Sequence, residues 1–236
     1  MYLKVKNFVE DLTGFSIYRT NTPWGHNIYN DLKRLKPDWS PQIIFDVGAN
    51  VGQTAIAFHK AWPNAKIFSF EPVKDTFAIL KTATQNLPNI EAVPMALGSS
   101  SGESSIKIFS DSRLASLDCN LSIRPSTNYE TIKILTSDEF CTLHSIDSVS
   151  LLKIDTEGYD LEVLKGSINL LKNEKIDFVI AEIAANSCPG KISLAEMDNF
   201  LNDYEMICIG IYEQDFWQQV GLYYGNSLFV RKTLIS

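Results

Sequence analysis

From Ile43 onward, short and wholly apolar runs alternate with longer segments in which apolar residues recur every three or four positions. The short runs are typical of strands buried on both faces, and the longer segments are typical of amphipathic helices. Strands and helices in alternation bury their apolar faces best as a parallel sheet covered by helices on both sides. The sequence therefore predicts an α/β fold with a Rossmann-like, mostly parallel sheet.

The predicted elements have approximate bounds. Strands are expected at 43–47, 66–70, 90–93, 151–154, 178–183, 206–211 and 227–231, and helices at 52–61, 74–86, about 161–171 and 193–203. In the helix at 74–86, Phe77, Leu80 and Ala83 are expected to face inward. No helical pattern separates the last two strands, so they are expected to pair antiparallel at one edge of the sheet.

Two further segments set the domain organisation. Residues 1–40 carry helical spacing, and Pro37 and Pro41 punctuate the chain just before the first strand. The runs SSIKIF and TIKIL look like an inserted hairpin at about 103–136. We predict an N-terminal helical extension over 1–40 and a Rossmann-like domain over 41–236.

Composition excludes several classes of protein. With 45% hydrophobic and 21% charged residues, the 236-residue chain has enough apolar material for a sizeable core. Its net charge of −7 argues against nonspecific binding of nucleic acid. The four cysteines form no CxxC pair, and no apolar stretch is long enough to span a membrane. The chain is expected to be cytoplasmic, with no nucleic-acid partner and no membrane span, and its composition sets no oligomeric state.

The segment FDVGANVGQ, at 45–53, joins the first strand to the first helix of the sheet. Its glycines, Gly48 and Gly52, allow a sharp turn and a close approach to a ligand, and the helix start offers free N–H groups. A dinucleotide loop would read G-x-G-x-x-G, whereas this loop places Asp46 before its first glycine. Asp46 would repel a pyrophosphate and attract a cationic amino-acid group. The alternative is a tight turn with a purely structural role.

Four other acidic residues lie at or near the ends of strands of the predicted sheet. Glu71, in SFEP, ends the second strand and would face a ribose, unless it is a solvated surface glutamate. Asp155 and Glu157, in KIDTEG, follow the fourth strand and either belong to a ligand site or form a solvated turn. Glu182 interrupts an apolar strand, so its charge needs a partner such as a metal, Lys153 or a substrate hydroxyl.

These segments resemble the FkbM-type methyltransferases. The likeness covers roughly 43–183, resumes at 226–231 and keeps the order and spacing of the motifs FDVGANVGQ, SFEP, LLKIDTEGYDLEVLKG, FVIAEI and SLFVRK. The resemblance implies a class I methyltransferase fold with S-adenosyl-L-methionine as cofactor. It also implies methyl transfer to a hydroxyl oxygen of a small molecule or glycan, such as a sugar or a secondary metabolite.

The resemblance also implies roles for particular residues. The loop residues Asp46, Gly48, Ala49, Asn50 and Gly52 would surround the methionine part of the cofactor. The ribose would be held by Glu71, next to Pro72, and the turn that contains Ala96 would lie near the adenine. Family members often carry a histidine soon after the strand that ends in glutamate. In this chain Ala184, Ala185 and Asn186 follow, which leaves the identity of the general base open.

A sugar hydroxyl is a poor nucleophile until it loses its proton, so a base or a metal ion should assist the reaction. Asp155 and Glu182 are the candidates, either as ligands of Mg²⁺ or Mn²⁺ or as groups that share the acceptor hydroxyl, and Glu157 is the alternative base. The aromatic residues near the last two strands, including Phe216 and Tyr224, could stack on a sugar.

Two other classes remain open. An NAD(P)-linked oxidoreductase would need a G-x-G-x-x-G loop and a hydride-transfer pair, and the sequence shows neither. A noncatalytic module that binds S-adenosylmethionine would keep the fold without turnover.

Overall fold

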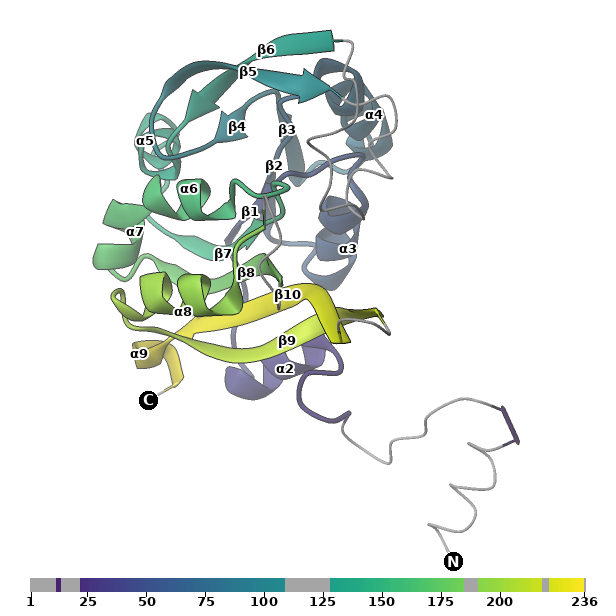
Figure 1. Ribbon diagram of the computed structural model, residues 1–236, viewed down its shortest axis with the longest axis vertical. Coiled ribbons are helices and arrows are strands. Elements are labelled where there is room, and N and C mark those ends of the chain that lie inside the picture. The colour runs from purple at the N-terminus through teal and green to yellow at the C-terminus, as the bar shows by residue number, and fades with distance from the viewer. Residues whose placement is uncertain (1–11, 14–21, 109–127, 185–190, 218–220, 236) are drawn as a thin grey trace, which may run out of the picture.

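The computed structural model describes residues 12–13, 22–108, 128–184, 191–217 and 221–235. Residues 1–11 and 14–21 of the predicted N-terminal extension lie outside these residues, as does the far part of the predicted hairpin at 109–127. The described chain forms a large twisted sheet with helices on both faces, and a smaller sheet beside its β3 end (Figure 1).

The large sheet has the strand order β3-β2-β1-β7-β8-β10-β9 within the described residues. Its strands are β1 (Ile43–Val47), β2 (Lys66–Phe70), β3 (Ile90–Val93), β7 (Val149–Ile154), β8 (Ile176–Ala184), β9 (Met206–Trp217) and β10 (Gly221–Arg231). The pairs that link β3, β2, β1, β7 and β8 are parallel, whereas β10 runs antiparallel to both β8 and β9. The predicted α/β fold is confirmed, including the antiparallel pair at one edge.

Helices cover both faces of the parallel strands, as expected where helical crossovers connect such strands. All six residues of β7 are buried, so this strand needs cover on both sides. One face carries α5 (Ser137–Leu143), α6 (Asp160–Lys165), α7 (Ile168–Lys172) and α8 (Leu194–Asn202), and the other carries α2 (Ile28–Leu35) and α3 (Gln53–Ala61). A further helix, α4 (Lys74–Thr84), packs beside β3, and α9 (Lys232–Ile235) follows β10. Strand order and helical cover bring the loops after β1, β2, β7 and β8 to one edge of the sheet.

A buried carboxylate, that of Asp31, attaches the helix α2 to β9, the strand at the other side of the sheet from β3. Asn27 caps its first turn, with the side chain accepting a hydrogen bond from the amide of Asn30. Asp31, fully buried, accepts hydrogen bonds from the Tyr212 hydroxyl of β9 at 3.0 Å and from the Gly25 amide at 2.8 Å. Burial and the neighbouring Asp31 carboxylate together raise the pKa of Tyr212. This network holds α2 over β9, which is 181 residues away along the chain.

The inserted segment forms the smaller sheet, in the order β4-β6-β5. Its strands are β4 (Ala96–Leu97), β5 (Gly102–Ile108) and β6 (Asn128–Leu135), and β5 and β6 pair antiparallel from Gly102 opposite Ile134 to Ile108 opposite Asn128. Glu130 of β6 accepts a hydrogen bond from the amide of Lys74, the first residue of α4, at 3.0 Å. The small sheet is therefore tied to the helix that begins just after β2.

Two predictions about helices were wrong in detail. The apolar pattern at 161–171 predicted one helix, but the structure has α6 and α7, with Gly166 and Ser167 between them. A Cβ atom on Gly166 would lie 1.9 Å from the carbonyl oxygen of Gly98, so close packing requires glycine there. In α4 the inward residue is Thr84 rather than Ala83, because the Thr84 hydroxyl is satisfied by the Leu80 carbonyl and can be buried without an unpaired polar group.

The β9–β10 ribbon is longer than the sequence pattern indicates, reaching Trp217 and starting again at Gly221. The far half of β9 contains Glu213, Gln214 and Asp215, and that of β10 contains Gly221, Gly225 and Asn226, so no continuous apolar run marks either part as a strand. No helix within the described residues is both long and apolar enough to cross a membrane.

Candidate active site

The loop between β1 and α3 is built from residues that accept a left-handed backbone. Gly48, Asn50 and Gly52 have φ values of 77°, 48° and 96°. Glycine adopts such values without strain, and asparagine tolerates them better than most residues. A Cβ atom on Gly48 would lie 1.9 Å from the carbonyl oxygen of Asp155. The loop after β1 therefore packs directly on the loop after β7.

Glu71 is joined to this loop through backbone amides. The amides of Gly48 and Ala49 donate to the Phe70 carbonyl, which carries the loop over the end of β2. One Glu71 carboxylate oxygen accepts from the Asn50 amide at 3.0 Å, and the other accepts from the Val73 amide at 2.9 Å. Burial raises the pKa of Glu71 to about 7, and these two hydrogen bonds oppose the rise. Each oxygen keeps a lone pair for a ligand hydroxyl.

Asp46 lies beneath the same loop, at the end of β1. Its side chain is fully buried, and neither carboxylate oxygen has a hydrogen-bond partner among the described residues. In the next strand Ser69, its register partner, is also buried, with a hydroxyl that lacks a partner within the described chain. Burial raises the pKa of Asp46, and the charge of Lys153 opposes this effect. The nearest cation, the ammonium group of Lys153, lies 3.4 Å from Asp46 Oδ1 and is shared with Asp155. A buried charge balanced in this way is a functional signal, because buried charged groups are costly.

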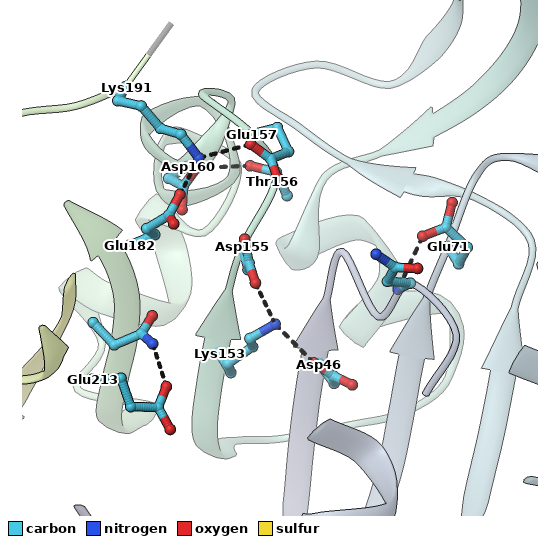
Figure 2. Close-up of polar contacts among 12 residues, drawn as sticks. Asp46, Glu71, Lys153, Asp155, Thr156, Glu157, Asp160, Glu182, Lys191 and Glu213 are labelled. Atoms are coloured by element: carbon cyan, nitrogen blue, oxygen red, sulfur yellow. Dashed lines mark hydrogen bonds and ion pairs between the residues drawn. The ribbon is translucent and has the colours of Figure 1, made fainter. Parts of the chain in front are cut away.

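Lys153 connects Asp46 to the KIDTEG turn. Its ammonium group lies 3.4 Å from Asp46 Oδ1 and 3.3 Å from Asp155 Oδ2, as the dashed lines in Figure 2 show. Burial by itself would lower the pKa of Lys153, but the carboxylates of Asp46 and Asp155 outweigh burial and raise it. The lysine therefore stays charged and holds Asp155 beside the loop after β1.

A second lysine, Lys191, positions the acidic residues near the end of β8. Lys191 forms ion pairs with Glu182 at the end of β8 and with Glu157, the latter at 2.7 Å (Figure 2). The predicted partner Lys153 was therefore wrong for Glu182. Lys153 and Glu182 rise from neighbouring strands, but Lys153 is taken by Asp46 and Asp155. Burial raises the pKa of Glu182 to about 7 in spite of the ammonium group of Lys191.

The turn that contains Glu157 is stabilised by a hydrogen bond to the start of α6. Glu157 has a φ value of 53° and Gly158 one of 106°. The Thr156 hydroxyl donates to the buried carboxylate of Asp160 at 3.0 Å, at the start of α6. The hydrogen bond to α6 thus fixes the turn. Asp155 pairs with Lys153, whereas Glu157 pairs with Lys191.

Asp155 and Glu182, the two residues predicted to bind a cation, each contact a lysine. Each carboxylate is paired with its own lysine. Within the described residues, no group of three or more histidine, cysteine, aspartate or glutamate side chains could hold a metal ion.

The remaining sequence-predicted residues lie along the same edge. Pro72 follows Glu71 directly, and Ala96 opens β4 just after β3. The Glu71 amide donates to the Val93 carbonyl at 3.1 Å, which ties the end of β2 to the end of β3. Sequence reasoning missed three polar residues of this edge: Lys191, Glu213 of β9 and Asn226 of β10. Asn226 is the register partner of Glu182, and only the pairing of β8 with β10 reveals this.

A glycine loop after the first strand, an acid after the second and loops gathered at the carboxyl ends of parallel strands are features of a Rossmann-like fold. The fold is similar to that of a crystal structure described as methyltransferase FkbM from Methylobacillus flagellatus KT. The TM-score is 0.50 at 15% sequence identity, and the match covers 81% of this chain and 43% of that chain. The chain belongs to the methyltransferase FkbM domain family, whose model matches residues 46–207.

Two curated relatives illustrate the family. The chain is 34% identical over 152 residues to the hexuronic acid methyltransferase AglP of Haloferax volcanii, covering 64% of this chain and 59% of the relative. The chain thus spans less than two thirds of that relative's length. It is 23% identical over 186 residues to the 2-O-methyltransferase NoeI of Sinorhizobium fredii, covering 73% of this chain and 74% of that relative.

Proposed function

We propose that this protein is an S-adenosyl-L-methionine-dependent O-methyltransferase that acts on a hydroxyl group of a sugar or glycan. The observation that carries the proposal is the fully buried carboxylate of Asp46 beneath a glycine loop, with Glu71 hydrogen-bonded to that loop. Membership of the methyltransferase FkbM domain family supports it, as do the names of two relatives, a hexuronic acid methyltransferase and a 2-O-methyltransferase.

The residues at the β1 and β2 ends fit this cofactor. Asp46 supplies the negative charge that a cationic amino-acid group needs, and Gly48 leaves the loop free of a side chain. Glu71 would accept hydrogen bonds from the ribose hydroxyls, with its carboxylate pinned by two backbone amides. Pro72 and Ala96 would border the rest of the nucleoside. When bound, the cofactor supplies a methyl group made electrophilic by a positively charged sulfur.

The residues at the β8 end would activate the acceptor. Glu182, with a pKa of about 7, can be half ionised near neutral pH and can take a proton from a hydroxyl group. Lys191 would hold Glu182 in place and stabilise its ionised form. Asp155, fixed by Lys153, would lie between the two halves of the site and orient the acceptor. Positioning of this kind can contribute about 7–11 kcal/mol to a displacement reaction.

This assignment makes the reaction independent of a metal ion. The two lysines already supply the positive charge that Asp155 and Glu182 would otherwise take from Mg²⁺ or Mn²⁺. Activity should therefore survive a chelator, and added Mg²⁺ should not raise it. A chelator-sensitive rate restored by Mg²⁺ or Mn²⁺ would replace this mechanism with the metal-assisted one.

Two measurements test the proposed function. Isothermal titration with S-adenosylmethionine and with NAD distinguishes the cofactor classes, and binding of NAD alone would favour an oxidoreductase. Release of S-adenosylhomocysteine in the presence of methyl glycosides then tests catalysis. Cofactor binding without release on any sugar, glycan or other hydroxyl compound would favour a noncatalytic binding module.

A further inference from the structure

The β9–β10 ribbon continues past the last residue of β8. The pairing of β10 with β8 ends at Tyr224 opposite Ala184, whereas the pairing with β9 continues to Gly221 opposite Trp217. The ribbon therefore extends beyond the carboxyl edge on the side where Glu182 lies (Figure 1). It forms a wall beside the candidate base.

A β-bulge in β9 changes the direction of the Glu213 side chain. Tyr224 pairs with Asp215 and Asn226 pairs with Tyr212, so Glu213 and Gln214 together oppose Gly225. Glu213 has a φ value of 49°, and a Cβ atom on Gly225 would lie 2.7 Å from Ile211 Cγ2. Bulges of this kind often redirect side chains beside active sites.

The redirected side chain meets Asn226. The Asn226 carboxamide donates to Glu213 Oε2 at 2.6 Å, and Asn226 is the register partner of Glu182 across β10 and β8. Figure 2 shows Glu213 below Glu182, on the side away from Glu71. A carboxylate and a carboxamide next to the base can accept from two hydroxyl groups and donate to a third oxygen.

We propose that Glu213 and Asn226 form the acceptor subsite and that it selects an uncharged sugar with adjacent hydroxyl groups over a uronate. This inference rests on the proposed function. One hydroxyl would bind the Glu213–Asn226 pair while its neighbour lies against Glu182. The subsite would therefore decide both which acceptor binds and which hydroxyl reaches the base.

Charge gives the preference for a neutral acceptor. Among the described residues around this subsite, the carboxylates of Glu157 and Glu182 pair with the ammonium group of Lys191, and Glu213, hydrogen-bonded to Asn226, adds a third negative charge. The excess of negative charge repels a carboxylate and matches the O–H donors of a neutral sugar. This differs from the hexuronic acid named for the Haloferax volcanii relative.

The test uses matched pairs of acceptors that differ in one group. The probes are the methyl glycosides of glucose, galactose and mannose and the corresponding methyl uronosides, each with S-adenosylmethionine. We expect kcat/KM for the best neutral sugar to exceed that of its uronate at least about tenfold. Glu213→Gln should narrow this preference, because it removes a negative charge and keeps the side-chain shape.

The variants separate acceptor binding from cofactor binding. Asn226→Ala and Glu213→Gln should raise the acceptor KM about tenfold while the Kd of S-adenosylmethionine stays unchanged. The matched control is Glu205→Gln, at the other end of β9, because Glu205 also has a positive φ, 57°, and a side-chain partner, Lys232. This control should leave both constants unchanged.

The outcomes are distinguishable. A wild-type preference for the uronates, or an unchanged acceptor KM in both variants, would overturn the subsite while leaving the proposed function in place. A wild-type protein that does not bind S-adenosylmethionine would overturn the proposed function itself. Binding without methyl transfer to any of the six sugars would contradict the sugar acceptor, and the subsite with it.

Discussion

The candidate site has two halves, one at the ends of β1 and β2 and one beside β8, β9 and β10, and different kinds of contact position the residues of each half. At the ends of β1 and β2, backbone groups position the site, since Glu71 is bound by two amides and Gly48 packs against the Asp155 carbonyl. At the ends of β8, β9 and β10, side chains position each other, through Lys191 and Asn226. Backbone contacts fix one shape, whereas side-chain pairs can be replaced one at a time. After their proposed roles, we call the β1–β2 side the cofactor half and the β8–β10 side the acceptor half, and we expect single substitutions to alter the acceptor half more readily.

The largest expected effect lies in the acceptor half. Glu182→Gln should lower kcat about a thousandfold, because the amide cannot take the acceptor proton. Cofactor affinity should not change, since Glu182 lies away from Glu71 and the glycine loop. Glu157→Gln is the matched control, with a second acid on the same lysine. A larger loss from Glu157→Gln would make Glu157 the base.

The next effect lies in the cofactor half and comes from the backbone. Gly48→Ala would place a methyl group 1.9 Å from the Asp155 carbonyl, at a φ of 77°. We expect the free energy of unfolding to fall by about 3 kcal/mol, measured by chemical denaturation, with cofactor binding lost. Gly210→Ala is the control, because its added Cβ would meet the Tyr212 side chain at an ordinary 3.5 Å. Equal effects from the two substitutions would mean that the loop contact has no special importance.

Glu71 gives a smaller effect that depends on pH. Glu71→Ala should weaken cofactor binding about 10- to 100-fold, through the loss of hydrogen bonds to a charged group. Burial raises the pKa of Glu71 to about 7 from an ordinary 4.5, so the folded protein keeps a proton that the unfolded chain releases over this range. The contribution of Glu71 to stability therefore falls as pH rises from 4.5 to about 7.

Cofactor binding should depend on pH in the opposite sense. The ribose hydroxyls would bind the ionised carboxylate, so affinity should rise as pH passes through about 7. Calorimetry across pH 5.5–8.5, roughly the range that brackets this pKa, measures the effect. Glu71→Gln should abolish the pH dependence. A wild-type affinity that does not change with pH would contradict the role of Glu71.

The smallest effect concerns Lys191. The rate should rise with pH as Glu182 ionises near pH 7, and the ammonium group of Lys191 lowers the pKa of Glu182 from the value that burial alone would give. Lys191→Met should move this rise to higher pH, and Lys191→Arg should not. At neutral pH the Met variant should lose about threefold to tenfold in rate. If the pH–rate profiles of the wild type, Lys191→Met and Lys191→Arg coincide, Lys191 has no effect on the ionisation of the catalytic base.

The sequence predicted the turn after β1 because the signals of that turn are local, and the cofactor role of its residues stays a prediction. Asp46, Gly48, Asn50 and Gly52 lie within seven consecutive residues, and left-handed turns and glycine contacts leave direct marks on composition. Strand bounds were also predictable, since fully buried strands are continuous apolar runs. The structure placed Glu71 where the strand order required it, and its role toward a ribose stays a prediction.

The acceptor half depends on contacts that no local pattern encodes. Lys191 follows Glu182 by nine residues, and its pairing appears only once both loops are in place. Asn226 reaches Glu182 through the register of β10 on β8, and the bulge at Glu213 depends on how β9 pairs. The sequence indicated that Glu182 needed a partner such as a metal, Lys153 or a substrate hydroxyl, and the structure pairs it with Lys191.

The central claim is that Asp46, the glycine loop and Glu71 form a pocket for a positively charged nucleoside. Calorimetric titration of the wild-type chain and of Glu71→Ala with S-adenosylmethionine, with NAD as the competing ligand, tests it most directly. We predict that the wild type binds S-adenosylmethionine at one site, that Glu71→Ala binds it more weakly, and that NAD gives no heat. Binding of NAD in place of S-adenosylmethionine, or equal affinity in the two proteins, would contradict the claim.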